Sequence, residues 1–399
     1  MTRPQLPAIE GGDPVRTTML PYGRHVVEEA DIQAVGKVLR GDWLTTGPTI
    51  EAFERAIADV TGAANVVAVS SGTAALHAAV VALDLRPGDE VIVPSLTFVA
   101  TANAVLYCQG RPVFAEVSPA TLTVDPHDVR RRVTSRTRAI ISVHYAGLGA
   151  DQRSLDAIAV QHGLRVVEDA AHALGARTDG APIGSRSDLA VFSFHPVKHI
   201  TTFEGGAVAA RSPLDAERLR RFRNHGISKD LRARERERTW QYEMVELGFN
   251  YRLSDVGAAM GLSQLRRIGE NLARRRSLAR GYRRELAGVD ELELQQVDRV
   301  DEHAWHIFPV LLRLECLRVD RDAVVRALRA DNIGANVHYA PVHLQPYYRR
   351  QLGTARGDLP VTEAVSERLI TLPLFAGMTD ADLLDVVVAL KRILRWYAA

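Results

Sequence analysis

Short apolar runs alternate with helical segments between Asn65 and Ala210. Several runs are apolar at every position, which is typical of strands buried on both faces of a mostly parallel sheet. The amphipathic or alanine-rich segments between them predict helices, and such alternation indicates a three-layer α/β domain. The predicted strands are residues 66–69, 90–93, 113–117, 139–143, 165–167, 189–194 and 207–210, and the predicted helices include 74–85, 100–107 and 155–162.

The pattern changes after Arg211. Residues 218–238 are dense in charges of both signs, which favours a solvated helix and loop over a polyanion site. One long helix is predicted at 253–286, followed by a strand at 307–314, a helix at 321–329, a strand at 335–339 and a helix at 380–396. Because 399 residues exceed the usual size of one hydrophobic core, we expect two domains. These are a large α/β domain with an N-terminal arm (1–250) and a small α+β domain (251–399).

The overall charge points to no polyanionic partner. Fifty basic against 48 acidic residues give a net charge of +2, so neither nucleic acid nor an anionic membrane is an expected partner. The two cysteines are far apart, as in a reduced protein without a disulfide framework. No signal-peptide core or membrane-length apolar segment is present, and we expect a cytoplasmic protein.

The first candidate site is the turn Ser70–Thr73, which follows a predicted strand and opens a helix. A helix N-terminus offers free N–H groups to a phosphate, and Gly72 lets the backbone approach closely. Ser71 and Thr73 add hydroxyls, although an ordinary N-cap explains the turn equally well. No Gly-Lys-Ser/Thr follows, so this is not a P-loop.

Two further segments carry ionisable groups. Asp169 ends a buried strand, where open α/β sheets bind ligands, and a carboxylate there can pair with a protonated pyridine nitrogen. His172 can hydrogen-bond a phenolic oxygen, or it is a satisfied core histidine. Lys198 follows another strand in a segment with few charges, where a lowered pKa would suit a Schiff-base lysine. His195 and His199 flank it, but no acidic residue completes a zinc pattern and we expect no metal.

The fourth segment, Glu246–Asp255, places the polar Asn250 and Arg252 in an apolar run that leads into the long predicted helix. Its Ser254 and Asp255 are interpreted as helix caps.

In this order and spacing, these segments resemble the sugar aminotransferases of the DegT/StrS type, from about Tyr22 to the C-terminus. The resemblance also includes Asp42–Pro48 and Gly248–Arg252. Within that family the chain is most similar to the enzymes of pseudaminic acid synthesis that aminate C4 of a UDP-linked 4-keto-6-deoxy sugar. The stretches His195–Thr202, Tyr242–Arg252 and Val337–Tyr348 carry this similarity, whereas Phe203 departs from the small residue usual there.

The resemblance implies an aspartate-aminotransferase-like (type I) pyridoxal-phosphate (PLP) fold and a homodimer with shared sites. It implies that Lys198 forms the Schiff base with PLP, that Asp169 pairs with the pyridine nitrogen and that His172 lies near the phenolic oxygen. The remaining roles implied by the motifs are stacking on the ring by Phe98, phosphate binding by Gly72, Thr73, Ser193 and the partner subunit's Asn250, and contacts to the nucleotide-sugar or donor carboxylate by Thr45, Thr46, Arg252 and His338.

The implied reaction moves an amino group from L-glutamate to a nucleotide-linked keto-sugar, with Lys198 as general base and acid. The same chemistry on a dTDP-keto-sugar or a keto-cyclitol is an open alternative. Sugar 3-dehydratases resemble this family but carry His at the position of Lys198. A non-catalytic PLP-binding regulator is a distant alternative, since Lys198 and Asp169 are both present.

Overall fold

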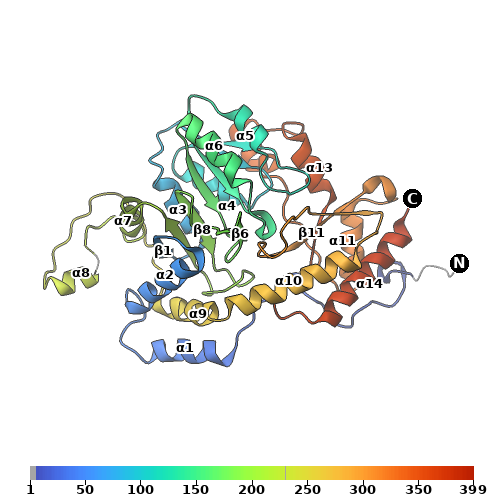
Figure 1. Cartoon of the computed structure of the whole chain (residues 1–399), viewed down its shortest axis with the longest axis horizontal. Helices are drawn as coiled ribbons and strands as arrows, with labels where there is room; N and C mark the ends of the chain where they lie inside the picture. Colours follow the sequence, from blue (N-terminus) through green and yellow to red (C-terminus); the bar gives the residue numbers. More distant parts are fainter. Residues whose placement is uncertain (1–5, 230) are drawn as a thin grey trace.

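The computed structural model describes residues 6–229 and 231–399, and its centre is a seven-stranded sheet (Figure 1). The strands lie in the order β1, β9, β8, β5, β4, β2, β3. Pairs from β8 to β3 are parallel, while β9 runs antiparallel to both its neighbours. The predicted α/β class with a mostly parallel sheet is confirmed. The strands are Asn65–Val69 (β1), Glu90–Pro94 (β2), Arg111–Ala115 (β3), Thr137–Val143 (β4), Arg165–Asp169 (β5), Leu189–Ser193 (β8) and Gly206–Ala210 (β9).

Helices cover both faces of this sheet because its strands are apolar on both sides. Successive strand residues point to opposite faces, so Val67 and Val69 pack in one core with the alanines of α3. Val66 and Ala68 pack in the other core with Phe53 of α2. The helices of this part are Glu29–Leu39 (α1), Pro48–Thr61 (α2), Gly72–Val81 (α3), Val99–Tyr107 (α4), Pro126–Arg132 (α5), Gln152–His162 (α6), Pro213–Phe222 (α7) and Leu231–Arg236 (α8).

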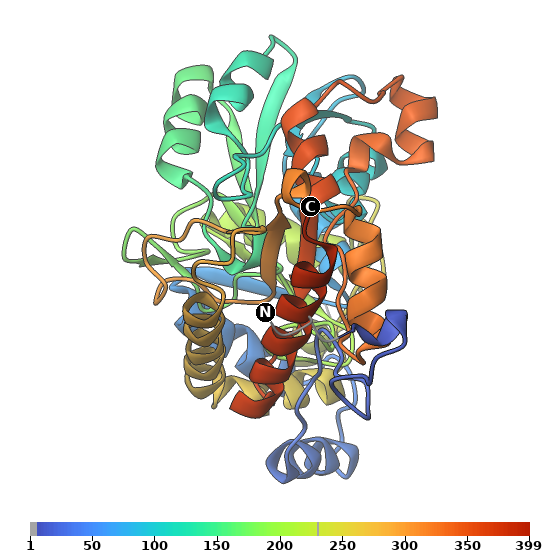
Figure 2. The same cartoon turned by 90° about the vertical axis from the view of Figure 1, so that its right-hand side faces the viewer.

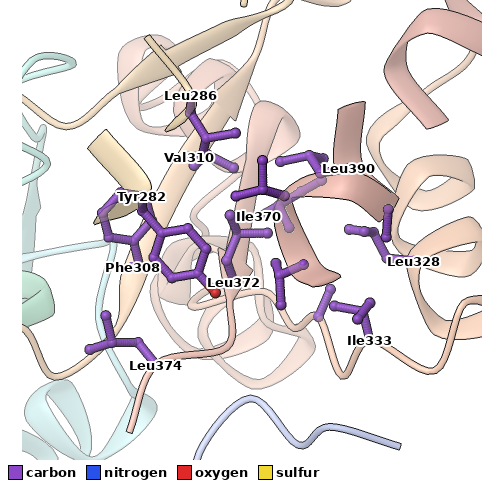
Figure 3. Packing of buried hydrophobic residues seen from close by; sticks show 14 of the residues in the cluster. Tyr282, Leu286, Phe308, Val310, Leu328, Ile333, Ile370, Leu372, Leu374 and Leu390 are labelled. Carbon is purple, nitrogen blue, oxygen red and sulfur yellow. The ribbon is translucent and has the colours of Figure 1, made fainter. Parts of the chain in front are cut away.

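A second, three-stranded antiparallel sheet lies in the C-terminal part, in the order β10, β11, β12. Figure 3 shows its core, where Tyr282 of α10 and Leu390 of α14 approach Phe308 and Ile370 of the sheet. In Figure 2, α14 crosses the front of this part with α11 beside it. The elements are Leu292–Leu294 (β10), Phe308–Leu312 (β11), Leu369–Leu372 (β12), Asp255–Leu265 (α9), Ile268–Glu285 (α10), Arg321–Ala330 (α11), Pro346–Leu352 (α12), Pro360–Arg368 (α13) and Asp380–Tyr397 (α14).

Short elements complete the fold. A two-stranded ribbon, Arg177–Thr178 (β6) and Ala181–Pro182 (β7), follows β5. The 3-10 turns are Ala8–Glu10 (η1), Tyr145–Gly147 (η2), Leu314–Cys316 (η3) and Val342–Leu344 (η4). Leu20 near the N-terminus lies in the core of the C-terminal sheet, and its N–H donates to the carbonyl of Asn332. Within the described residues no helix is both long and apolar enough to cross a membrane.

The single helix predicted at 253–286 is wrong, because the chain bends between α9 and α10. Arg267, at the bend, leaves helical geometry (φ −112°, ψ 15°). Its guanidinium forms two bonds to Asp31 of α1, of 2.9 and 2.6 Å. The bend lets α9 pack beside α2 while α10 turns toward the C-terminal sheet.

The strand predicted at 335–339 is also wrong. Asn336 forms a two-bond bridge with Thr371 of β12, but the pairing stops there. Past the bridge, the side-chain oxygen of Asn336 accepts the N–H of Val337 at 2.8 Å. His338 then contacts β12 through its side chain, whose Nδ1 lies 2.9 Å from the hydroxyl of Thr371, and not through a backbone pair. The chain therefore leaves the sheet, and His338 and Tyr339 turn toward the carboxyl ends of the parallel strands.

Candidate active site

Lys198 lies in a closed loop that begins directly after β8. The loop is held by hydrogen bonds from the N–H of Phe194 to Gly205 (2.9 Å) and from the N–H of Thr202 to Phe194 (3.0 Å). The Lys198 amine lies 3.4 Å from Nε2 of His306. Burial lowers the pKa of this amine to about 8; Asp169 opposes the shift and the charge of Arg275 adds to it. Lys198 is therefore far easier to deprotonate than an ordinary lysine.

Asp169 ends β5, next to β8 in the sheet, and is buried. Its two oxygens accept the hydroxyl of Thr101 at 2.8 Å and the N–H of Ala171 at 3.2 Å. Burial raises the pKa of this carboxyl, while both hydrogen bonds and the charge of Lys198 lower it. A cation bound beside Asp169 would favour the ionised form further.

His172 faces the same space and keeps one nitrogen free of protein partners. Its Nε2 lies 3.1 Å from the hydroxyl of Tyr339, and its buried Nδ1 has no hydrogen-bond partner among the described residues. The ring centroids of His172 and His306 are 4.4 Å apart. Burial holds the pKa of His172 well below its ordinary value, so the ring is neutral. Phe98, half exposed at the start of α4, lies with its ring 6.0 Å from that of Tyr339.

The turn before α3 meets the end of β8. Ser71 is the N-cap of α3, accepting the N–H of Ala74 at 3.0 Å, so the capping interpretation is correct for Ser71. Gly72 and Thr73 occupy the first helical positions, whose N–H groups have no partner within a helix. A Cβ at Gly72 would stand only 2.9 Å from Cβ and Oγ of Ser193. Gly72 thus keeps open a space between a helix N-terminus and a serine hydroxyl.

Of the expected substrate contacts, His338 lies with the Lys198 group. It is buried, its Nδ1 is 2.9 Å from the hydroxyl of Thr371, and burial together with the charge of Lys198 lowers its pKa to about 4.

The other expected substrate contacts are Thr45, Thr46 and Arg252, and Asn250 was expected to reach the phosphate from the partner subunit. Within one chain these four residues form their hydrogen bonds elsewhere. Thr45 bridges Ser254, and the Thr46 hydroxyl donates to the Thr45 carbonyl at 2.7 Å. Asn250 bridges Asn224, whose Oδ1 accepts from Arg252 at 2.6 Å. Across 6–229 and 231–399 no hydrogen bond joins any of these four to Lys198, Asp169 or His172.

Four residues of this site were missed by the sequence reasoning: Thr101, Arg275, His306 and Tyr339. Tyr339 follows His338 directly and belongs to a segment already identified, so the neighbouring motif could have indicated it. His306 and Arg275 come from a loop and a helix more than 70 residues beyond Lys198 and carry no motif of their own. In the part of the chain that the structure describes, no group of three or more His, Cys, Asp or Glu side chains could hold a metal ion.

Comparison with known proteins places this geometry in a family. Residues 25–391 match the DegT/DnrJ/EryC1/StrS aminotransferase family. The chain is 38% identical over 380 residues to the uncharacterized protein MJ1066 of Methanocaldococcus jannaschii, covering 95% of this chain and 98% of that protein.

Solved structures agree with this match. Helicobacter pylori PseC, an aminotransferase involved in the biosynthesis of pseudoaminic acid, has a TM-score of 0.88 at 27% identity, over 95% of this chain and all (100%) of that one. The putative sugar aminotransferase Spr1654 of Streptococcus pneumoniae, in its PMP-form, has a TM-score of 0.89 at 29% identity, over 94% and 99%. DesI, solved in the presence of its TDP-sugar product, has a TM-score of 0.85 at 32% identity, over 96% and 95%.

The residues present fit the cofactor of this family. The first helical turn at Gly72 suits a phosphate. The ring of His172, whose Nδ1 has no partner among the described residues, lies 4.4 Å from that of His306, which neighbours the Lys198 amine. Asp169 is a buried carboxylate without a cationic hydrogen-bond partner. The expected fold, enzyme class and cofactor are therefore confirmed by the family match and the solved relatives. The chain belongs to the DegT/DnrJ/EryC1/StrS family of PLP-dependent sugar aminotransferases.

Proposed function

We propose that this enzyme transfers an amino group from L-glutamate to C4 of a nucleotide-linked 4-keto-6-deoxy sugar, with a UDP-sugar favoured. The observation that carries the chemistry is the buried group of Lys198, Asp169 and His172, which unites a low-pKa amine, a carboxylate and a free imidazole nitrogen. The choice of sugar is supported by the similarity to PseC and by the segments that resemble enzymes of that type.

In this proposal Lys198 attaches PLP, Asp169 faces its ring nitrogen and His172 faces its phenolic oxygen. Gly72, Thr73 and Ser193 hold the phosphate at the start of α3, and Phe98 covers the ring. When bound, PLP supplies the electron sink that makes the Cα proton of an amino donor acidic. Asp169 strengthens this effect by keeping a positive charge on the ring nitrogen.

Lys198 moves the proton. Since its pKa is about 8, about a tenth of the amine is neutral at pH 7, far more than for an ordinary lysine, and can take the proton from the donor Cα. In the second half of the reaction Lys198 moves a proton in the opposite direction, as the amino group passes to the sugar. The neutral His172, with its pKa held low by burial, adds no competing positive charge.

A TDP-keto-sugar is the second candidate acceptor, and a specific observation favours it. DesI, solved with its TDP-sugar product, is 32% identical to this chain, compared with 27% for PseC. Phe203 also bears on the choice, because this exposed ring stands in the Lys198 loop where a small residue was expected. We propose that Phe203 narrows the sugar pocket, together with contacts from Thr45, Thr46, Arg252 and His338.

The homodimer and the two-domain division also stay proposals. An exposed apolar surface from Trp240 to Phe249 supports the dimer, with Trp240 82% and Leu247 77% exposed. Several exposed apolar side chains gathered in one segment are typical of an interface between subunits. It directly precedes Asn250, so a partner docked there would bring Asn250 near a neighbouring site. The second, C-terminal sheet supports a small domain after residue 250.

The test is an absorbance titration of the purified enzyme with PLP. We expect L-glutamate to convert the PLP band to that of the aminated cofactor, and a UDP-4-keto-6-deoxy sugar to restore it. If only a TDP-keto-sugar restores the PLP band, the second candidate is the acceptor and the UDP-sugar is not. No spectral change with any amino donor would contradict the proposed function.

A further inference from the structure

His306 lies next to the amine of Lys198, and the proposed function gives His306 no role. It comes from the loop before β11, far along the chain from β8. Its Nε2 lies 3.4 Å from the Lys198 amine, and its side chain is buried. Long-range packing alone brings the two side chains together.

The backbone around His306 is fixed on several sides. Its N–H donates to the carbonyl of Ala146 at 2.8 Å, and its carbonyl accepts Nη1 of Arg275 at 3.1 Å. Two residues earlier, the carbonyl of Ala304 lies 3.1 Å from Nε2 of His199. Arg275 is buried, and its other bonds go to the carbonyls of Trp305 and Leu374. These contacts hold the His306 ring at one place beside the amine.

The ring is in the protonation state that accepts a hydrogen bond. Burial holds the pKa of His306 well below its ordinary value, and the nearby charge of Lys198 lowers it further. A neutral imidazole carries one N–H, and a proton on Nδ1 leaves Nε2 as an acceptor facing the amine. The Nδ1 atom has no partner among the described residues, so no protein donor faces Nδ1 and opposes a proton there.

We propose that His306 is a positioning residue that accepts a hydrogen bond from the Lys198 amine whenever the amine is not attached to the cofactor. This inference rests on the proposed role of Lys198. In a transaminase the lysine is detached from the cofactor while the substrates react, and a buried amine without a partner is costly. His306 keeps the amine within the site, where proton transfer depends on its position.

The proposed hydrogen bond predicts the direction in which the pKa of Lys198 shifts when His306 is replaced. An acceptor stabilises the ammonium form, so loss of His306 lowers the Lys198 pKa. The ionisable groups that face Lys198 from the surrounding elements are Asp169, His172, His199, Arg275, His306 and His338. A variant that replaces only His306 keeps the other five side chains.

The experiment uses the small number of lysines in the chain, which are Lys37, Lys198, Lys229 and Lys391. Full-length protein freed of PLP is labelled with trace acetic anhydride from pH 6 to 10, and each lysine is followed by mass spectrometry. The variants are His306→Leu, His306→Gln, whose amide reaches the place of Nε2, and His306→Asn, whose amide does not. The matched control is His303→Leu, a buried histidine in the same loop whose ring stacks on Trp305 at 3.8 Å.

We expect half-maximal labelling of Lys198 near pH 8 in the wild type. In His306→Leu and His306→Asn the midpoint falls by about one pH unit, a tenfold change in the ionisation constant. His306→Gln and His303→Leu keep the wild-type midpoint. An unchanged midpoint in the Leu and Asn variants, or an equal shift in His303→Leu, contradicts the inference.

A second measurement separates this inference from the proposed function. Wild-type protein with PLP is reduced with borohydride, and the modified lysine is identified by mass spectrometry. Modification at a lysine other than Lys198 contradicts the proposed function. Modification at Lys198 with an unchanged midpoint in the His306 variants contradicts the positioning role alone.

Discussion

Two buried polar groups in this protein contain histidine but differ in how their polar atoms are satisfied. In one, Nδ1 of His343 lies 2.7 Å from Oγ of Ser95 and its Nε2 lies 3.0 Å from Glu363. In the other, around Lys198, His172 and His306 each keep a buried nitrogen without a partner among the described residues. Buried polar groups are almost always paired, so two unpaired nitrogens beside the Lys198 amine fit a cluster that binds a ligand.

The first cluster places a serine, a histidine and a glutamate in a row, as in a hydrolase, but it cannot act as one. Ser95 is fully buried, and its Oγ also accepts the N–H of His343 at 3.1 Å. Glu363 further accepts the N–H groups of Gly357 and Leu359. The network joins the end of β2 to η4 and α13 and stabilises the fold. A row of chemically suitable residues therefore indicates function only where a substrate can reach it.

The largest expected effect comes from Lys198→Ala. Without the amine that moves the proton, turnover falls by about 10²–10⁴-fold or more. Steady-state assays with L-glutamate and the keto-sugar measure the loss, and circular dichroism checks the fold. Lys37→Ala, at an exposed lysine on α1, serves as the control and keeps wild-type turnover. Near-normal turnover of Lys198→Ala would show that the group around Lys198 is not the catalytic one, and its contrast with the His343 group would have no meaning.

Asp169→Asn is expected to lower turnover by about 10²–10³-fold, because the neutral amide no longer favours a positive charge on the cofactor nitrogen. The loss should lie in kcat, with a smaller change in cofactor affinity measured by fluorescence titration. Asp156→Asn on α6 is the matched carboxylate control. Equal losses in the two variants would show that the effect is general destabilisation.

Thr101→Val removes the hydroxyl that donates to Asp169, and we expect about a tenfold loss of turnover. That bond lowers the Asp169 pKa, so its removal raises the pKa of an already raised group. Activity requires the ionised carboxylate, and the acid limb of the pH–rate profile should move to higher pH. Thr61→Val, which removes a buried hydroxyl bonded to Ile57, should leave the profile unchanged.

Glu363→Gln tests the structural role of the His343 group, and of these variants it should have the smallest effect on turnover. We expect the free energy of unfolding at neutral pH to fall by about 1–3 kcal/mol, with kcat unchanged. Burial raises the Glu363 pKa, but bonds from His343, Gly357 and Leu359 outweigh it and hold the pKa below its ordinary 4.5. The charge therefore stabilises the fold above about pH 4.5, and the difference from wild type should shrink on acidification. Urea unfolding at pH 7 and pH 4 tests this, and a large loss of kcat would contradict a purely structural role.

Local patterns in the sequence predicted much of the sheet. Short apolar runs, several of them apolar at every position, identified the seven strands of the large sheet, and β5 and β8 are buried on both faces. The patterns failed where a tertiary contact overrides local preference. Arg267 bends a helical segment because it binds Asp31, more than 230 residues earlier. The β-like run at Asn336 pairs with β12 at one bridge only, because His338 contacts Thr371 through its side chain.

By itself, the sequence determined the fold class, the family and the order of the motifs around Lys198 and Asp169, since these depend on local periodicity and short segments. Only the tertiary structure decided which neighbours share their space. It brought His306 to 3.4 Å from the Lys198 amine, Thr101 to Asp169, and Tyr339 to His172. It also paired His343 completely while leaving His172 and His306 unpaired. The reason is physical, because hydrogen-bond satisfaction and pKa depend on burial and on atoms brought from distant parts of the chain.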